Sequence, residues 1–593
     1  MPAVDDRFQM AQEILSKYYG YEIFRSGQDE IVRSVLAGRD TVGIMPTGGG
    51  KSICYQIPAL IFPHLTLVIS PLISLMKDQV DALDNVGIAA TYINSTLTSS
   101  ELKVRMRQVE QGAYHLLYVS PERLDSAAFL AWLNRLQPAH VAIDEAHCLS
   151  QWGHDFRPSY RAIAPLLQKF DHRPIISALT ATATPEVMED IIQILEMRVP
   201  NVVVTGFDRA NLTFSVISGQ VKKDFVWQYL ADHPQQAGII YAATRKEVDG
   251  LYEFLKKKRI AVGRYHAGLS DAERSNHQEQ FLYDETRIMV ATNAFGMGID
   301  KSNIRFVIHY NMPKNLESYY QEAGRAGRDG DKGECILLFS PQDVQTQKFL
   351  IEQSSNIRQS VEYRKLQGMI DYCRTTKCLR AHMLRYFGES AAESCANCGN
   401  CNQAFDVQDV TIPAQQIFSC VVRVKERFGV KMIAGILKGS HDKRILALDL
   451  HQLPTYGVMS KKPEKEIMGL IHTLIADGYL KLTEGKYPVV QLHSTAVPIL
   501  KQQAKVMIKI QQKASTDQVD STLFEQLRAW RKAISLREKI PPYVIFSDRT
   551  LHELASVCPL DREALLGVKG IGEMKLEKFG QDLLAICRSH HTG

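Results

Sequence analysis

The segment from Met45 to Ser52 combines glycines, a lysine and a hydroxyl residue in the order of a phosphate-binding loop, M-P-T-G-G-G-K-S. Consecutive glycines let the backbone approach phosphate oxygens and point its amides at them. The lysine would then reach the β- and γ-phosphates of ATP, and the serine hydroxyl would take one position around Mg²⁺. The alternative is a glycine-rich turn with a surface lysine. The order of residue types favours ATP and Mg²⁺ binding by Thr47, Gly48, Gly49, Gly50, Lys51 and Ser52.

A pair of carboxylates follows an apolar run further along the chain, in the sequence V-A-I-D-E-A-H. The apolar run predicts a buried parallel strand whose carboxyl end opens onto a ligand crevice. Asp144 would hold Mg²⁺, and Glu145 would orient or deprotonate the attacking water. A strand that ends in a solvated acidic turn is the alternative, and the upstream Lys51 argues against it.

Two arginines, Arg325 and Arg328, lie in the segment Q-E-A-G-R-A-G-R that begins at Gln321. On a helix, residues at this spacing share one face. Guanidinium groups are planar and permanently charged, so they suit the charge that spreads over a transferring phosphoryl group. Taken alone, the segment would be an ordinary basic helix.

These residues need elements that bring them together. Between about residue 25 and residue 345, short β-branched runs alternate with amphipathic stretches. The alternation predicts an α/β fold with two doubly wound parallel sheets, one per lobe, that meet near 207–213. Thr184 and Pro185 predict the start of a helix. The expected strands are 67–69, 116–119, 141–143, 175–178, 238–241, 288–291 and 306–308.

Length and composition indicate a multidomain globular protein. The 593 residues predict about four domains. The apolar content of 45% is ordinary, and the net charge of +5 permits a nucleic-acid partner without proving one. The N-terminus lacks the basic and then apolar stretch of a signal peptide. Prolines interrupt the uncharged stretch 57–76, so we expect a helix end, a turn and a strand there, and no membrane span.

Four of the 11 cysteines, Cys378, Cys395, Cys398 and Cys401, have the spacing of a metal site. The odd count and the local clustering argue against a disulfide framework and for a reducing cytosol. Four thiolates could close a tetrahedral structural zinc site, with Cys373 as a spare. An iron–sulfur cluster is the sharper alternative, because successive C-x-x-C steps also occur there.

With these motifs in this order, the chain resembles the bacterial RecQ family of superfamily 2 DNA helicases over nearly its whole length. The resemblance makes Arg328 the arginine finger and Arg325 a second contact to the γ-phosphate. It also favours zinc over iron–sulfur at the cysteines. An adenine-reading motif is implied upstream, where a glutamine can pair with adenine and flat side chains can stack on it. The further nucleotide contacts implied in this way are Tyr21, Arg25, Gln28 and Gln321.

The segment after the carboxylates, Q-W-G-H-D-F-R from Gln151 to Arg157, resembles the aromatic-rich loop of that family, which couples DNA binding to ATP hydrolysis. Exposed aromatic residues beside arginine form a stacking platform for single-stranded bases. A buried aromatic cluster is the alternative. Small hydroxylated residues of two further motifs suit phosphate contacts without base preference. The DNA and coupling residues implied are Gln151, Trp152, His154, Phe156, Arg157, Thr180, Thr182, Thr292 and Asn293.

The resemblance divides the chain into five units. Two RecA-like helicase lobes are expected at 1–208 and 209–345, a zinc-binding helical module at 346–406 and a winged helix at 407–512. A polar linker at 511–517 then leads to a small all-α HRDC domain at 520–593.

The two C-terminal units imply further DNA contacts. The winged helix would offer Lys443 and Arg444 to duplex phosphates, and its wing would be the hairpin 479–492. In the HRDC domain, the segment G-V-K-G-I-G at 567–572 could present amides to phosphate or simply pack two helices. The DNA contacts proposed there are Tyr543, Arg562 and Lys569.

The function implied is an ATP-dependent DNA helicase that moves 3′ to 5′ on single-stranded DNA and unwinds duplex DNA in repair, recombination and replication-fork maintenance. Its cofactors would be ATP, Mg²⁺ and Zn²⁺. Its partners would be single-stranded and tailed duplex DNA, and a single-stranded-DNA-binding protein at the winged helix. We expect a monomer in the bacterial cytoplasm, associated with the nucleoid and not with a membrane. An RNA helicase and an ATP-gated nucleic-acid clamp are the alternatives.

Overall fold

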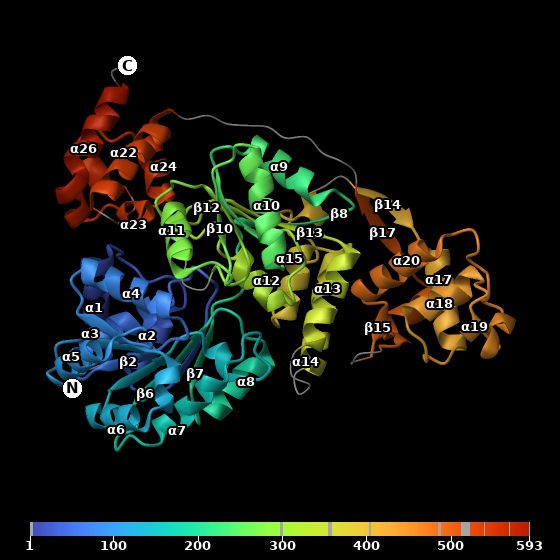
Figure 1. Cartoon of the computed structure of the whole chain (residues 1–593), viewed down its shortest axis with the longest axis horizontal. Helices are drawn as coiled ribbons and strands as arrows, with labels where there is room; N and C mark the ends of the chain where they lie inside the picture. The colour runs from blue at the N-terminus through green and yellow to red at the C-terminus, as the bar shows by residue number, and fades with distance from the viewer. Residues whose placement is uncertain are drawn as a thin grey trace.

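The computed structural model describes residues 4–296, 301–353, 359–402, 405–483, 488–511, 522–538, 540–568 and 570–591. Two α/β lobes form the centre of the molecule, and three smaller units follow them along the chain. Figure 1 shows the second lobe, in green, between the blue first lobe, the orange region around α18 and the red C-terminal helices. Among the described helices, none is long and apolar enough to span a bilayer.

The first lobe contains a seven-stranded sheet in the order β3-β4-β2-β5-β6-β1-β7, in which all neighbours are parallel. Alternate side chains of β2 enter two different cores, because Leu67 and Ile69 pack on one face and Val68 on the other. Coverage of both faces explains why the strands read as continuous apolar runs. The strands are β1 (Thr41–Ile44), β2 (Thr66–Ile69), β3 (Ala90–Ile93), β4 (Leu116–Val119), β5 (His140–Ile143), β6 (Ile175–Thr180) and β7 (Asn201–Val204).

Helices cover this sheet and carry several predicted motifs. The predicted helix start at Thr184 and Pro185 is confirmed, although the Thr184 hydroxyl donates to Oε2 of Glu186 at 2.9 Å and makes no cap bond to the backbone. The helices are α1 (Val4–Ile14), α2 (Gln28–Leu36), α3 (Ile53–Ile61), α4 (Ile73–Asn85), α5 (Ser99–Glu110), α6 (Ala127–Leu136), α7 (Ile163–Leu167) and α8 (Pro185–Ile194).

The second lobe has a six-stranded parallel sheet in the order β10-β11-β9-β12-β13-β8. The prediction of two doubly wound parallel sheets is therefore confirmed. The strands are β8 (Leu212–Ser218), β9 (Ala237–Tyr241), β10 (Val262–Tyr265), β11 (Ile288–Ala291), β12 (Ile304–His309) and β13 (Gly333–Phe339). The helices are α9 (Lys222–Asp232), α10 (Arg245–Lys257), α11 (Asp271–Leu282), α12 (Leu316–Ala323) and α13 (Pro341–Glu352).

A helical module follows the second lobe and joins it to a mixed unit. Asp477 of the mixed unit accepts hydrogen bonds from the Thr375 hydroxyl at 2.9 Å and the Thr376 amide at 3.0 Å, so the two units are fixed together. The module consists of α14 (Gln359–Arg374), α15 (Leu379–Tyr386) and α16 (Gly399–Asn402). The mixed unit contains β14 (Phe405–Asp409), α17 (Thr411–Arg423), α18 (Val430–Lys438), α19 (Lys443–Ala447), α20 (Glu464–Ala476), β15 (Leu480–Leu482), β16 (Val490–Leu492), α21 (Val497–Leu500) and β17 (Met507–Gln511).

The predicted hairpin of the mixed unit is present, because β15 and β16 pair antiparallel. The tip of this hairpin, 484–487, lies outside the described residues. An antiparallel pair of β14 with β17 closes the unit and has no counterpart in the prediction. The predicted linker 511–517 lies outside the described residues except for Gln511.

The C-terminal unit is all-helical, with α22 (Thr522–Glu538), α23 (Pro542–Ile545), α24 (Asp548–Val557), α25 (Arg562–Leu566) and α26 (Glu573–His591). It packs against the second lobe, where Arg528 donates to the Gln235 carbonyl at 3.4 Å and Lys532 donates to the Asp284 carbonyl at 3.2 Å. These helices lie beside α11 of the second lobe in Figure 1.

Candidate active site and metal centre

The phosphate loop follows β1 and ends at the start of α3, so the helix amino terminus points at the loop. Gly48 and Gly50 have φ values of +79° and +74°, a region that favours glycine. A Cβ atom on Gly49 would lie 2.9 Å from the Pro46 carbonyl oxygen. The shape of the loop therefore requires these glycines. A glycine-rich turn with a surface lysine, the alternative, does not account for their arrangement.

Lys51 and the two carboxylates come together at one end of the sheet. Lys51 is partly buried and donates to the Met45 carbonyl at 3.4 Å. Burial lowers the pKa of Lys51, and the charges of Glu145 and Asp144 oppose that effect. Oγ1 of Thr47 is buried without a hydrogen-bond partner among the described residues. A partly buried ammonium, two carboxylates and an unsatisfied hydroxyl fit a nucleoside triphosphate with a divalent cation, whose ligands are oxygen atoms.

Asp144 and Glu145 differ in environment although they are adjacent. Burial, together with the charge of Glu145, raises the pKa of Asp144. For Glu145, the hydrogen bond and charge of His147 outweigh burial and lower the pKa. Nδ1 of His147 lies 3.3 Å from Oε2 of Glu145 and 2.8 Å from Oγ1 of Thr180. Glu145 also has a φ of +47°, a strained conformation of the kind that clusters at active sites.

Side chains from the segment before α2 hold the phosphate loop. Gln28 is buried and donates its amide hydrogens to the carbonyls of Gly49 and Gly50, both at 3.0 Å. Arg25 donates to the Gly48 carbonyl at 2.7 Å and lies 6.0 Å from the ring centroid of Tyr21. Tyr21 is exposed, so its ring is accessible to a base. The adenine-reading role of these residues stays a prediction.

The two arginines do not share a helix face, and that prediction is wrong. Helix α12 ends at Ala323, and Arg325 and Arg328 lie in the turn that follows. A Cβ on Gly324 would lie 2.2 Å from Oγ1 of Thr47, so the turn approaches the phosphate loop too closely for another residue. Gly327, with φ of +56°, then separates the two side chains.

The separated arginines reach different places. The Cγ atom of Arg328 lies 3.2 Å from the position of a Cβ on Gly48, so this side chain packs on the phosphate loop. Arg325 is buried and donates to the Gly296 carbonyl. Arg328 therefore packs against the phosphate loop, while Arg325 joins the turn to the loop that follows β11.

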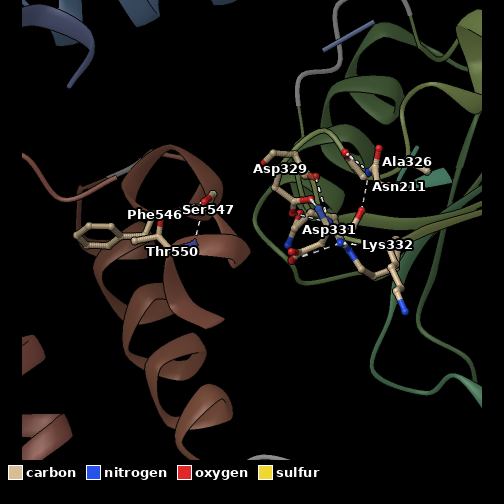
Figure 2. A network of polar contacts seen from close by, with 12 residues as sticks. Asn211, Ala326, Asp329, Asp331, Lys332, Phe546, Ser547 and Thr550 are labelled. Atoms are coloured by element: carbon tan, nitrogen blue, oxygen red, sulfur yellow. Dashed lines mark hydrogen bonds and ion pairs between the residues drawn. The ribbon is translucent and has the colours of Figure 1, made fainter. Parts of the chain in front are cut away.

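A network around this turn fixes its shape (Figure 2). The Asn211 amide donates to the carbonyls of Gly327 and Asp331 at 2.9 and 2.6 Å. Arg305 of β12 forms ion pairs with Asp329 and Asp331. Motif matching missed these residues, and it also missed Arg209, which bonds to loops of both lobes. No local pattern marks them, because their partners lie far away in the sequence.

The four predicted metal ligands form one cluster. The sulfur atoms of Cys378, Cys395, Cys398 and Cys401 all lie within 4.8 Å of one another, and those of Cys378 and Cys398 are 3.9 Å apart. A tetrahedral zinc site with Zn–S bonds of 2.3 Å has sulfur atoms about 3.8 Å apart. Sulfur atoms this close enclose one ion and leave no room for an iron–sulfur cluster. Cys373 lies on α14 outside the cluster, as predicted.

The zinc module packs on the segment that joins the lobes. Arg380 donates to the Arg209 carbonyl at 2.9 Å and to the Leu212 carbonyl, and it pairs with Asp208. The Asn397 amide donates to the Ala210 carbonyl at 2.8 Å. The cysteine cluster therefore holds the inter-lobe segment in place.

Comparisons with known proteins agree with this architecture. Five family models match successive parts of the chain. They are DEAD/DEAH box helicase at 25–191, helicase conserved C-terminal domain at 221–330, RecQ zinc-binding at 341–402, RQC domain at 404–517 and HRDC domain at 520–587.

A protein of Bacillus subtilis named ATP-dependent DNA helicase RecQ is 51% identical over 573 residues, which cover 96% of this chain and 97% of that protein. The chain belongs to the RecQ family of ATP-dependent DNA helicases. The protein of the same name from Pasteurella multocida is 39% identical over 98% of this chain and 94% of its own length. The solved structure of the DEAD-box helicase Mss116 matches 65% of this chain and 92% of its own, with a TM-score of 0.50 and 16% identity, which supports the two-lobe fold.

The aromatic-rich loop of this RecQ chain has both an exposed and a buried part. Trp152 is 43% exposed, and Gln151 is also exposed. His154 is buried, stacks on His147 at 4.3 Å, and places Nε2 3.2 Å from Oε1 of Gln321 in the second lobe. The loop thus leaves one aromatic ring exposed and places a histidine at the lobe interface.

The remaining residues of the loop support its shape. Arg157 donates to Asp155 at 3.2 Å and to the Pro71 carbonyl at 2.9 Å. Phe156 is half-buried, with the guanidinium of Arg161 5.3 Å from its ring centroid. These contacts do not show that Phe156 or Arg157 binds DNA, so their role in coupling DNA binding to ATP hydrolysis stays a prediction.

Trp152 lines a cavity of about 320 Å³ at the junction of the first lobe and the zinc module. The guanidinium of Arg364, on α14, lies 5.2 Å from the Trp152 ring centroid. The other lining residues are Glu186, Glu189, Asp190 and Gln193. The neighbouring Lys365 forms a buried ion pair with Glu317 of α12, the helix that leads to the arginine turn. Helix α14 therefore touches both the aromatic loop and the arginine-bearing segment.

Two further motifs lie near the lobe interface. Thr180 is buried, and its hydroxyl oxygen accepts a hydrogen bond from the Thr182 amide at 3.2 Å. Thr292 and Asn293 follow β11, and Asn293 is exposed. The rest of that motif, 297–300, lies outside the described residues.

The predicted DNA contacts of the two C-terminal units have mixed outcomes. Lys443 and Arg444 are exposed at the start of α19, and Arg562 is exposed at the start of α25. Val568 and Ile571 are buried in the helical core, which favours packing as one role of the turn at 567–572. Lys569 and the side chain of Tyr543 lie outside the described residues.

Proposed function

We propose that this chain is an ATP-dependent DNA helicase that translocates 3′ to 5′ on single-stranded DNA and unwinds duplex DNA. The observation that carries the proposal is the meeting of two loops from different lobes. The phosphate loop of the first lobe contacts the arginine turn of the second at Gly48 and Arg328. Nucleotide bound there would touch both lobes, so its hydrolysis would change their arrangement.

Within this site, Lys51 and the loop amides would bind the β- and γ-phosphates. Ser52 and Asp144 would hold Mg²⁺, which when bound supplies charge neutralisation to the phosphates. Glu145, kept ionised by His147, would orient or deprotonate the attacking water. Arg328 would stabilise the charge that develops on the transferring phosphoryl group, and tyrosine, arginine and glutamine of the upstream motif would hold adenine.

DNA would enter through the aromatic-rich loop. A base stacked on Trp152 would move this loop, and His154 would carry the change to Gln321 beside the nucleotide. Thr180, whose hydroxyl lies 2.8 Å from Nδ1 of His147, and Thr182 would link the ATP and DNA sites, while Thr292 and Asn293 would contact phosphates from the second lobe.

The proposed units are the lobes at 1–208 and 209–345, the zinc module at 346–406, the winged helix at 407–512 and the HRDC domain at 520–593. The winged helix would hold duplex DNA ahead of the lobes and receive a single-stranded-DNA-binding protein. We further propose a monomer in the bacterial cytoplasm, associated with the nucleoid, that serves repair, recombination and replication-fork maintenance.

The test is ATP hydrolysis measured alone, with single-stranded DNA and with RNA, alongside unwinding of duplexes with a 3′ tail, a 5′ tail or none. We expect DNA to stimulate hydrolysis and only the 3′-tailed duplex to be unwound. Stimulation by RNA alone would replace the proposal with an RNA helicase. DNA binding with hydrolysis but without unwinding would indicate an ATP-gated clamp.

A further inference from the structure

Arg209 occupies an unusual place for an arginine, between the two loops that meet at the ATP site. It follows β7 in the segment that joins the lobes and is only partly accessible. Its backbone carbonyl accepts hydrogen bonds from the Arg380 side chain at 2.9 Å and from the Leu212 amide at 2.9 Å. The start of the side chain is therefore fixed by the zinc module on one side and by β8 on the other.

The guanidinium of Arg209 bonds to both lobes at once. Its Nη1 donates to the Thr47 carbonyl of the phosphate loop at 2.6 Å and to the Gly324 carbonyl at 3.3 Å. Its Nη2 donates to the carbonyls of Ala326 and Gly327 at 3.2 and 2.8 Å. A planar fork of donors can satisfy four carbonyls in this way, whereas a lysine ammonium cannot span them.

The bonding of Arg209 is to neutral groups. Among the described residues, no carboxylate forms an ion pair with it, and the charged side chains that act on it most are Arg328 and Arg25. Burial lowers the pKa of the guanidinium, and those two neighbours lower it further. A partly buried cation without a carboxylate partner costs free energy, so a purely structural bridge would be better made by a neutral side chain.

We propose that Arg209 is a positioning residue for hydrolysis, which sets the separation between the phosphate loop and the arginine turn and so places Arg328. This inference rests on the proposed function of the site. Arg209 uses its donors on loop carbonyls, so it acts through Arg328 and not by direct contact with the phosphates.

The experiment compares Arg209→Lys and Arg209→Ala with the unchanged chain in steady-state hydrolysis with saturating single-stranded DNA. Because a displacement of about 1 Å can cost about 10²-fold in rate, we expect kcat to fall about 10- to 100-fold. The KM for ATP should change less than about threefold, because ground-state binding does not use this side chain. Affinity for ADP and the thermal unfolding midpoint of the lysine variant should stay close to those of the unchanged chain.

Asn211→Ala is the matched control, because among the described residues the Asn211 side chain bonds only to the arginine-turn side, at Gly327 and Asp331. Its kcat should fall less than that of Arg209→Lys. Equal losses would overturn the bridging role.

A double-mutant cycle decides whether Arg209 acts through Arg328. In an Arg328→Ala background, Arg209→Lys should lower kcat by less than about threefold, because coupled residues are not additive. If Arg209→Lys lowered kcat in the Arg328→Ala background as much as it does in the unchanged chain, the proposal would be overturned. A raised KM with unchanged kcat would also overturn it, because that result indicates direct phosphate binding. If the unchanged chain fails to hydrolyse ATP, the proposed function fails. If it hydrolyses ATP and Arg209→Lys matches it, only this inference fails.

Discussion

The zinc cluster and the ATP site lie on either side of the same inter-lobe segment, yet they are built in opposite ways. All four cysteine ligands come from between Cys378 and Cys401, and their sulfur atoms already lie within bonding range of one ion. The proposed ATP site draws its side chains from two lobes, with Lys51 in one and Arg328 in the other. A closed local site is suited to stability, and a divided site is suited to movement.

Arg380 and Arg209 show how the two sites are linked. Arg380 extends from the zinc module to the backbone of the inter-lobe segment, and Arg209 extends from that segment to the loops of the ATP site. Damage to the zinc cluster should therefore reach the ATP site, while damage to the ATP site should leave the zinc cluster intact. This asymmetry is testable.

The largest effect is expected from loss of the metal. Structural zinc contributes about 10–16 kcal/mol to the folding of small modules, so Cys395→Ala should unfold the zinc module and release the inter-lobe segment. We expect insoluble or protease-sensitive protein with reduced hydrolysis. Zinc content, limited proteolysis and ATP hydrolysis measure this.

Cys373→Ala is the matched control for that variant, because Cys373 is buried on the same module but outside the cluster. It should keep its zinc and lose only about 1 kcal/mol of stability. A soluble, zinc-free and fully active Cys395→Ala protein would refute the structural role of the cluster.

The next largest effect tests the other half of the comparison. Lys51→Ala should abolish hydrolysis and unwinding, with kcat lowered at least about 10²- to 10³-fold, because a charged donor to the phosphates is lost. Stability and zinc content should be unchanged, since Lys51 lies in the first lobe and its removal leaves the metal module untouched. Hydrolysis rate, zinc content and thermal unfolding measure this.

Lys103, an exposed lysine on α5, provides the control variant Lys103→Ala, which should hydrolyse ATP normally. If Lys51→Ala lost zinc or unfolded at a much lower temperature, the asymmetry between the two sites would be wrong.

The same difference explains what could be read from the sequence. The strands β4 and β11 begin and end where the local apolar pattern predicts them, and the cysteine spacing predicts a cluster that the structure contains. The arginine turn was not predictable, because α12 stops where Gly324 meets Thr47 of the other lobe. Such a contact depends on residues far apart in the chain, as do the bonds of Arg209 and the pairing of β14 with β17.

A smaller effect is expected at Trp152 of the first lobe, where this lobe contacts the zinc module through Arg364. Stacking of a base on an aromatic side chain contributes about 1–3 kcal/mol. Trp152→Ala should therefore lower DNA-stimulated hydrolysis about tenfold or more while much of the DNA binding remains. Hydrolysis against DNA concentration measures both quantities.

Trp227 offers a control of similar exposure, 41% against 43%, on α9 of the second lobe. Trp227→Ala should leave DNA stimulation unchanged. Unaltered stimulation in Trp152→Ala would exclude the stacking role.

The smallest effect concerns Arg364 of the zinc module, which lies over the Trp152 ring. An exposed cation–π contact contributes about 0.5–1 kcal/mol, less than the stacking of a base, so DNA should displace this arginine. Arg364→Ala removes the competitor and should lower the DNA concentration for half-maximal stimulation about two- to fivefold. For Arg364→Lys, which retains a cation, this DNA concentration should lie between those of the unchanged chain and Arg364→Ala.

The double variant Trp152→Ala with Arg364→Ala separates competition from other roles of Arg364. Without the Trp152 ring there is nothing for the guanidinium to cover, so the second change should add nothing to the first. A weaker affinity for DNA in Arg364→Ala would instead mean that Arg364 binds DNA phosphates. The zinc module would then contribute to the DNA site directly, and the division between a stabilising region and a working region would not hold at this contact.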